Sequence, residues 1–249
     1  MNQTFRLVLA WALAWPTLLT AQATTYNQKV EADSFVSSGL PDGNFGGAGG
    51  MEIAAPTLTQ LRTEISLIRF DTAALQASMI ADYGLGNWQV TAVTLTLFSN
   101  VARAGQQPNN SIFNKIAAGD FAFGLLSNNN WSETDITWNT LPSLLPGTEA
   151  NTLTPLGTFY WDATGQPSST WTLDLDALLV GEINAGGKVS LLGEPTEGSA
   201  VGYLSNTLTS RAGYLSVTVQ AVPEPSIRVL IGTLIVVMVG KKLRYGIWS

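Results

Sequence analysis

Apolar and polar residues alternate along several stretches of the chain, which is typical of strands that bury one face. The clearest stretches are 93–97, 171–176 and 215–220, where Val, Leu or Trp alternates with Thr, Ser, Asp or Gln. A period of two places the apolar side chains of such a stretch on one face of a sheet. Residues 65–70 differ, because apolar residues occupy both parities there. This pattern predicts an inner strand that is covered on both faces.

Gly- and Asn-rich segments separate these stretches and favour turns. They lie at 39–50, 105–111, 127–130 and 186–187. Residues 72–82 and 176–183 are the two segments that we expect to form short helices. Short strands joined by polar connections predict an all-β fold, specifically a jelly-roll β-sandwich. We expect it to form one domain over residues 24–220.

The first 23 residues have the order of a secretory signal peptide. Arg6 lies near the amino terminus, an apolar run covers 7–19, and Ala21 and Ala23 form a small-x-small cleavage site. The 13-residue run is shorter than the roughly 20 residues of a membrane span, and Pro16 interrupts it. We therefore expect export by the Sec machinery and cleavage after Ala23. An uncleaved anchor helix is the alternative.

A second apolar run covers residues 229–239, within a segment 227–240 that could form one helix, and is followed by Lys241, Lys242 and Arg244. As a helix this segment would be about 21 Å long, against about 30 Å for the hydrocarbon core of a bilayer. A transmembrane helix here would therefore need local thinning and outward-reaching basic side chains. The basic residues favour the cytoplasmic side, which places the rest of the chain on the other side of the membrane.

The segment Pro223, Glu224, Pro225 and Ser226 stands just before this run. Its two prolines keep the backbone extended and accessible. The order of motif, apolar helix and basic tip over residues 221–249 resembles the PEP-CTERM sorting signal that exosortases of Gram-negative bacteria recognise. The resemblance implies an intermediate in the inner membrane and a final place in the cell envelope or outside the cell. Arg228 and the residues after Arg244 depart from the pattern, and an ordinary tail anchor is the alternative.

The chain contains no His and no Cys. This excludes Ser-His-Asp and Cys-His nucleophiles, His-ligated zinc or copper, and iron–sulfur clusters. The full chain carries a net charge of −6, but residues 24–220 contain seven basic and 17 acidic residues and carry −10. That charge disfavours nucleic acid as a partner. It permits calcium, or a polymer bridged through calcium.

A series of short motifs resembles the DNRLRE-type domains. The motifs include Ala-Asp at Ala32, Asn-Phe-Gly at Asn44, Arg-Phe-Asp at Arg69 and a Trp-Ser-Glu-Thr-Asp-Ile-Thr-Trp-Asn block at Trp131. The segments that carry the resemblance are 32–36, 44–46, 68–71, 90–98, 131–139 with Pro142, 171–179 and 203–219. That family is a jelly-roll sandwich similar to carbohydrate-binding modules, and some members bind acidic polysaccharides such as alginate. Residues 210–214 and the long Asn-rich stretch 100–130 depart from the pattern.

Two candidate binding features follow from these residues. Jelly-roll modules often hold a structural calcium ion through carboxylates near a sheet edge, and Glu31 and Asp33 lie on one parity at the start of the first motif. The alternative is that Asp33 caps a turn. Trp131 is a candidate for stacking on a sugar ring, with packing over a loop as the alternative. On a continuous strand, Trp131 and Trp138 would face opposite ways.

Paired carboxylates are the only acid–base groups that the composition offers for cleaving a glycoside. Glu133 with Asp135, and Asp174 with Asp176, share parities, but such neighbours on one strand usually mark a solvated face or helix caps. We expect Arg69 to pair with a carboxylate, with Asp71 and Asp33 as candidates.

Three functions remain open from the sequence. The one we favour is a non-catalytic envelope protein that binds polysaccharide or contributes to an extracellular matrix. The others are a glycoside hydrolase or polysaccharide lyase on the same sandwich, and a surface protein without a ligand.

Overall fold

The computed structural model describes residues 22–56, 61–98, 119–146, 151–161, 168–197, 200–204 and 212–222. The strands and helices, in chain order, are β1 (Thr24–Lys29), β2 (Ala32–Ser37), β3 (Gly50–Ala54), β4 (Glu64–Asp71), α1 (Ala73–Tyr83), β5 (Trp88–Phe98), β6 (Gly119–Leu126), β7 (Leu153–Trp161), β8 (Ser168–Leu173), α2 (Ala177–Ala185), β9 (Lys188–Glu197), β10 (Ala200–Leu204) and β11 (Tyr214–Ala221). A short 3₁₀ turn covers Leu141–Ser143. The mainly β composition agrees with the all-β prediction.

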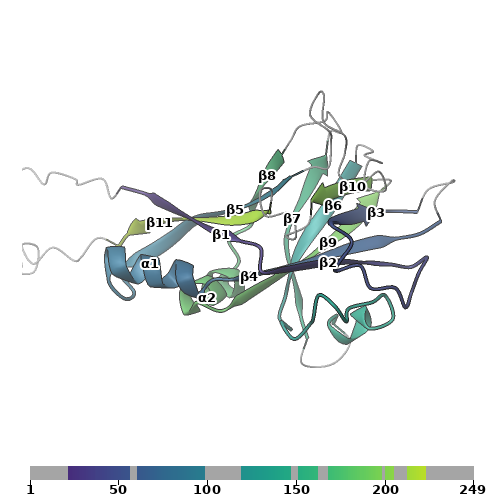
Figure 1. Cartoon of the computed structure of the whole chain (residues 1–249). Helices are drawn as coiled ribbons and strands as arrows, with labels where there is room; N and C mark the ends of the chain where they lie inside the picture. The colour runs from purple at the N-terminus through teal and green to yellow at the C-terminus, as the bar shows by residue number, and fades with distance from the viewer. Residues whose placement is uncertain are drawn as a thin grey trace, which may run out of the picture.

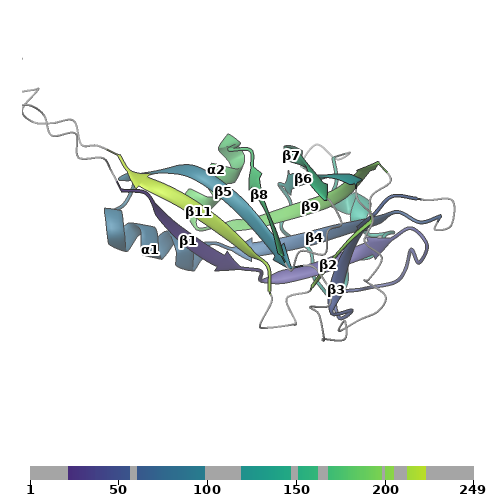
Figure 2. The same cartoon turned by 90° about the horizontal axis from the view of Figure 1, so that it is seen from above.

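The strands form two antiparallel sheets that face each other (Figures 1 and 2). One sheet has four strands in the order β1-β11-β5-β8. The other has seven, in the order β10-β3-β4-β9-β6-β7, with β2 pairing β4 beside that path. This arrangement fits the predicted sandwich.

Apolar side chains fill the space between the two sheets. Leu95 of β5 and Val217 of β11 are fully buried there, as the alternation of their strands predicts. Phe121 of β6 meets Trp171 of β8 edge to face, with ring centroids 5.2 Å apart, and so links the two sheets. One detail of the prediction is wrong, because β8 ends at Leu173 and Leu175 beyond it is 45% exposed.

Strand β4 is covered on both faces, as predicted. Ile68 and Phe70 point into the core between the sheets. Leu67, on the other parity, belongs to a second buried cluster on the outer face of the seven-stranded sheet. Residues 127–146 supply much of that second cluster, so they form an additional layer over the sheet.

Both predicted helices are present and lie together at one end of the sandwich (Figure 1). Leu75 and Met79 of α1 and Leu179 and Ile183 of α2 are buried. The Asn184 carbonyl of α2 accepts from the Gln76 side chain at 2.6 Å and ties the helices together.

The first and last strands pair with each other. Thr24 of β1 lies opposite Val219 of β11, so the two ends of the described domain leave it side by side. None of the described helices is long and apolar enough to cross a membrane. The predicted signal peptide up to Ala21, the sorting motif from Pro223 and the segment 227–240 lie outside the described residues.

Part of the Asn-rich stretch 100–130 proves to be regular structure. Residues Gly119–Leu126 form β6, which pairs with both β7 and β9 inside the larger sheet. Residues 100–118 lie outside the described part of the chain.

Candidate functional site

Trp131 anchors the outer layer to the sheet below it. Its ring is only 6% exposed, and its indole N–H donates to Ser190 Oγ of β9 at 3.0 Å. The Arg69 guanidinium of β4 lies over the ring, 4.8 Å from its centroid. The same guanidinium donates to the Trp131 carbonyl at 2.6 Å. The residue is therefore held from the side chain and from the backbone.

The local fold changes one expectation about the Trp131 block. Residues 131–139 form turns rather than a continuous strand, so the argument from parity does not apply to them. Trp131 and the half-buried Trp138 both pack against the outer cluster. Arg69 covers one face of the Trp131 ring and only a small part of the ring reaches the surface, so stacking of a sugar on Trp131 stays a prediction.

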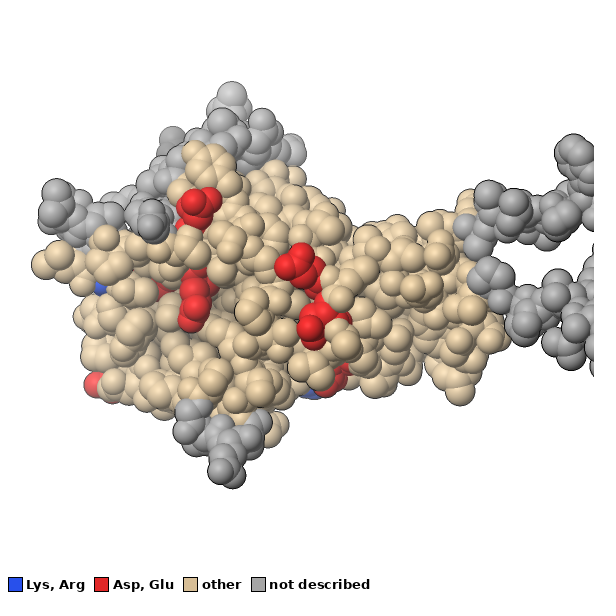
Figure 3. Space-filling model, turned by 180° about the vertical axis from the view of Figure 1, so that it is seen from behind, with Lys and Arg blue, Asp and Glu red and all other residues tan. Residues whose placement is uncertain are grey.

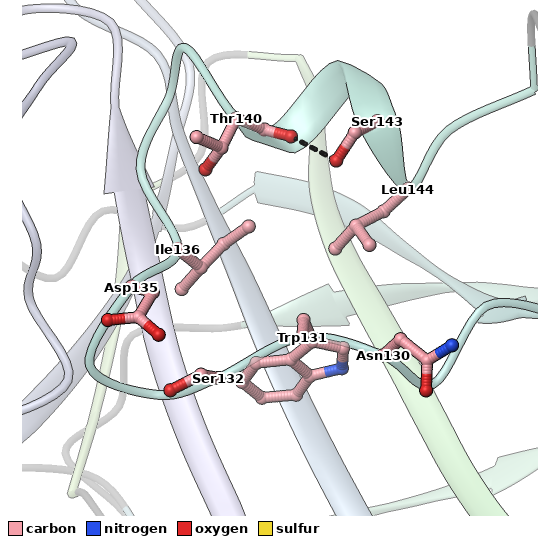
Figure 4. Close-up of a pocket in the computed structure, with 8 residues that line it drawn as sticks. All are labelled: Asn130, Trp131, Ser132, Asp135, Ile136, Thr140, Ser143 and Leu144. Carbon is pink, nitrogen blue, oxygen red and sulfur yellow. Dashed lines mark hydrogen bonds between the residues drawn. The ribbon is translucent and has the colours of Figure 1, made fainter.

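A pocket of about 420 Å³ opens above that part of Trp131 (Figure 4). Its floor is apolar, because Trp131, Ile136 and Leu144 point toward one another from the 131–136 turn and the end of the 3₁₀ turn. Its rim is polar and is formed by Asn130, Ser132, Asp135, Thr140 and Ser143. No Lys or Arg lines this pocket among the residues that the structure describes.

The rim keeps hydrogen-bonding capacity for a ligand. The Ser143 hydroxyl donates to the Thr140 carbonyl at 2.7 Å and can still accept a bond. Asn130 and Asp135 are exposed, and they add an amide and a carboxylate. An apolar floor with acceptors and donors around it suits a ring that has CH faces and hydroxyl edges.

The loop that contains Asn44 holds the 133–136 turn of the pocket in place. The Asn44 side-chain amide donates to the carbonyls of Glu133 and Ile136, each at 2.9 Å. A Cβ atom on Gly46 would lie 2.1 Å from the Glu133 carbonyl oxygen, so only glycine fits there. The Asn-Phe-Gly and Trp131 motifs, far apart in sequence, thus form one structural unit.

Glu31, a candidate calcium ligand, pairs with two basic side chains. Its carboxylate is 2.9 Å from Lys188 Nζ and 3.0 Å from Arg69 Nε. Burial alone would raise the pKa of Glu31, but the hydrogen bonds from Lys188 and Arg69 outweigh it and lower the pKa. Arg69 therefore pairs with a carboxylate as expected, but Glu31 was not among the expected partners. The Asp71 carboxylate instead accepts from the Ala73 N–H at the start of α1.

Asp33 is buried near Glu133. Burial, and next the charge of Asp33, raise the pKa of Glu133, against the opposing effect of Arg69. Within the described ranges, no three acidic side chains gather in an arrangement that would hold a metal ion. Calcium at Asp33 therefore stays a prediction.

Two further carboxyl groups are buried on adjacent inner strands of the larger sheet. Glu52 of β3 is 2% exposed and Glu64 of β4 is 1% exposed. Arg62 lies 2.5 Å from Glu64 Oε1 and 3.7 Å from Glu52 Oε2. Burial, together with the neighbouring Glu52, raises the pKa of Glu64 to about 8 despite Arg62. We therefore infer that Glu64 keeps its proton at neutral pH.

The carboxylates considered as catalytic pairs lie in different places and have different contacts. Asp176 Oδ1 accepts from the Leu178 N–H at 2.7 Å and caps α2. Asp135 lies on the pocket rim, and Asp174 lines a different hollow, with Glu194. Sequence reasoning missed Glu194. Gly124, inside the neighbouring strand β6, was the available signal, because a glycine within a strand often marks a place where a ligand approaches closely.

Residues 24–219 match the model of carbohydrate-binding module family 96. No curated protein matches the chain.

Proposed function

Because the chain belongs to carbohydrate-binding module family 96, we propose that it binds polysaccharide through the Trp131 pocket. Membership of this family supports carbohydrate binding. Carbohydrate-binding modules typically do not catalyse a reaction. The observation that carries the proposal for this site is the pocket itself, which combines an apolar floor with an uncharged and acidic rim. Sugars bind through this combination of CH contacts and hydroxyl hydrogen bonds.

The pocket variants Asn130→Ala and Asp135→Ala test this site. Each removes one rim group and is expected to weaken binding about 3- to 10-fold, the usual loss for one hydrogen bond. The measurement is native affinity electrophoresis of the full chain in gels that contain soluble glucan, mannan, xylan or alginate. Asp82→Asn removes the same charge from an exposed position on α1, keeps an oxygen that can accept from the Tyr26 hydroxyl, and serves as the control.

Two outcomes would count against the proposal. Equal retention of wild type and both pocket variants would move the site elsewhere. Migration of the wild type that no polysaccharide slows would overturn polysaccharide binding.

We further propose that the protein is exported, sorted by an exosortase, and placed in the cell envelope or extracellular matrix. Support comes from the order of signals in the sequence: Ala21 and Ala23 before the domain, and the Pro223–Ser226 motif with its basic tip after it. The pairing of β1 with β11 supports an attachment at one end of the domain, because both junctions emerge side by side. We also propose that a calcium ion bound at Asp33 would have a structural role in the domain.

Mass spectrometry of the protein isolated from its native cells tests the processing. The expected mature chain begins at Thr24, and its carboxyl end lies near the Pro223–Ser226 motif if the sorting signal is cleaved. Detection of an intact amino-terminal Met1 segment on the mature protein would contradict export through a cleaved signal.

A further inference from the structure

A second hollow lies on the outer face of the larger sheet, over β6 and β7. Its volume is about 380 Å³, and its lining includes Ala122, Gly124, Thr158, Asp174 and Glu194. We call it the β6–β7 groove. Figure 3 shows one face of the molecule, on which acidic side chains are spread and basic ones are visible only at the margins.

Small residues keep the groove open. Ala122 of β6 provides almost no side chain above the sheet, and the Leu153 side chain of β7 covers Gly124, where a Cβ atom would lie 2.5 Å from Leu153 Cδ1. Gly157 of β7 has a φ of +127°, and a Cβ atom there would lie 2.8 Å from the Phe159 ring. Glycine is required at that position because other residues rarely adopt this φ. The hollow is therefore specified by the sequence of the two strands.

The strand register places polar groups on both sides of this floor. Ala122 lies opposite Glu194 of β9 on one side and opposite Thr158 of β7 on the other. Two strand spacings of about 4.8 Å separate Glu194 from Thr158. Two residues beyond Thr158 on the same parity, Tyr160 is 60% exposed and lies opposite Asp120. The face thus combines acceptors, a hydroxyl and an accessible aromatic ring.

Both carboxylates of the groove have unused acceptor capacity. In the described part of the chain, neither the Glu194 nor the Asp174 side chain has a hydrogen-bond or ion-pair partner. Glu194 is half-buried, and this burial raises its pKa. Glu194 is a partly desolvated acceptor without a described donor, which is unfavourable, whereas Asp174 is exposed. A ligand that supplies O–H donors therefore gains most from Glu194.

We propose that the β6–β7 groove is a second binding site, for an uncharged polysaccharide. Glu194 and Asp174 accept hydrogen bonds from ring hydroxyls, Thr158 adds a hydroxyl, and Tyr160 stacks on a neighbouring sugar. An acidic chain such as alginate is disfavoured, because its carboxylates would meet Glu194 and Asp174 without a described Lys or Arg in the lining. This inference rests on the proposed polysaccharide binding and deepens it by naming the class of glycan.

Two groove variants of the full chain test this site. Glu194→Gln keeps the shape and removes the charge, and it is expected to weaken binding to a neutral glucan, mannan or xylan about 10-fold, the loss expected for a hydrogen bond to a charged group. Ala122→Leu fills the floor and is expected to weaken it at least as much. Asp82→Asn is the charge-matched control, and melting curves establish that each variant is folded.

Salt provides a second readout for the same proteins. Retention on a neutral polysaccharide should stay nearly constant between 0.05 and 0.5 M NaCl, because no ion pair forms. Retention on alginate, if any, should depend strongly on salt.

The outcomes separate this inference from the proposed function. Weaker binding of both folded groove variants to a neutral polysaccharide supports the groove. Unchanged binding of these variants, or binding of the wild type to alginate alone, overturns the groove and leaves polysaccharide binding intact. Absence of binding to every polysaccharide overturns both.

Discussion

Replacing Trp131 with alanine is expected to destabilise the domain by about 3–5 kcal/mol, the range for truncating a large buried aromatic residue. The side chain is 6% exposed, donates to Ser190 and lies beneath the Arg69 guanidinium. Its loss leaves a cavity at the centre of the outer cluster and leaves Arg69 without its ring. Since native domains are stable by only about 5–15 kcal/mol, the effect should be large in urea unfolding followed by far-ultraviolet circular dichroism.

Trp138→Ala is the matched control for this experiment. Trp138 belongs to the same block but is only half-buried against the cluster, so its truncation should cost less than half as much. Trp131→Phe keeps an aromatic ring, although a smaller one, and loses the N–H to Ser190, with an expected cost of about 1–2 kcal/mol for the lost hydrogen bond. A Trp138→Ala effect equal to or greater than that of Trp131→Ala would show that Trp131 is not the anchor.

The second large effect concerns the pH dependence of stability, which Glu64 should dominate. Its pKa in the folded protein is about 8, above the ordinary value of 4.5. A carboxyl with a raised pKa stabilises the fold fully below its unfolded pKa, and this stability is lost as the pH rises toward the folded pKa. The wild type should therefore lose roughly 1–4 kcal/mol between pH 5 and pH 9.

Glu64→Gln imitates the protonated carboxyl and should remove most of this dependence. The variant is expected to be more stable than the wild type at pH 9 and similar to it at pH 5, as measured by urea unfolding at each pH. Glu31→Gln is the control with the opposite sign, because Lys188 and Arg69 lower the pKa of Glu31. Glu31→Gln should be less stable than the wild type at neutral pH, by under about 1 kcal/mol, and equally stable in acid, where the wild-type Glu31 is protonated. A wild type that becomes more stable from pH 5 to pH 9, with Glu64→Gln following the same curve, would refute the protonated Glu64.

The sequence predicted the parts of the fold that depend on local pattern. Alternation located the inward faces of β5 and β11, and apolar residues on both parities identified β4 as a strand covered on both sides. The two helices were found within a few residues of their bounds. These features are local, because a period of two or a capping Asp acts over a few residues.

The features that failed depend on contacts between distant segments. Residues 131–139 contain β-prone Trp, Thr and Ile, yet they form turns because Asn44 and Gly46 hold them against the sheet. The ion pair of Arg69 with Glu31 depends on how β2 pairs with β4, which the spacing alone does not give. The β6–β7 groove was missed for the same reason, since the sheet register places Glu194 beside β6, and the bond from the Asp174 N–H to the Leu156 carbonyl places Asp174 beside β7.

The most direct test of polysaccharide binding is a titration of the isotope-labelled full chain with a neutral polysaccharide, followed by amide nuclear magnetic resonance spectra. We expect the signals of Asn130, Ser132 and Asp135 in the pocket, and of Thr158 and Glu194 in the groove, to shift with saturation. Spectra that stay unchanged with every polysaccharide, or shifts confined to residues away from both hollows, would contradict the account.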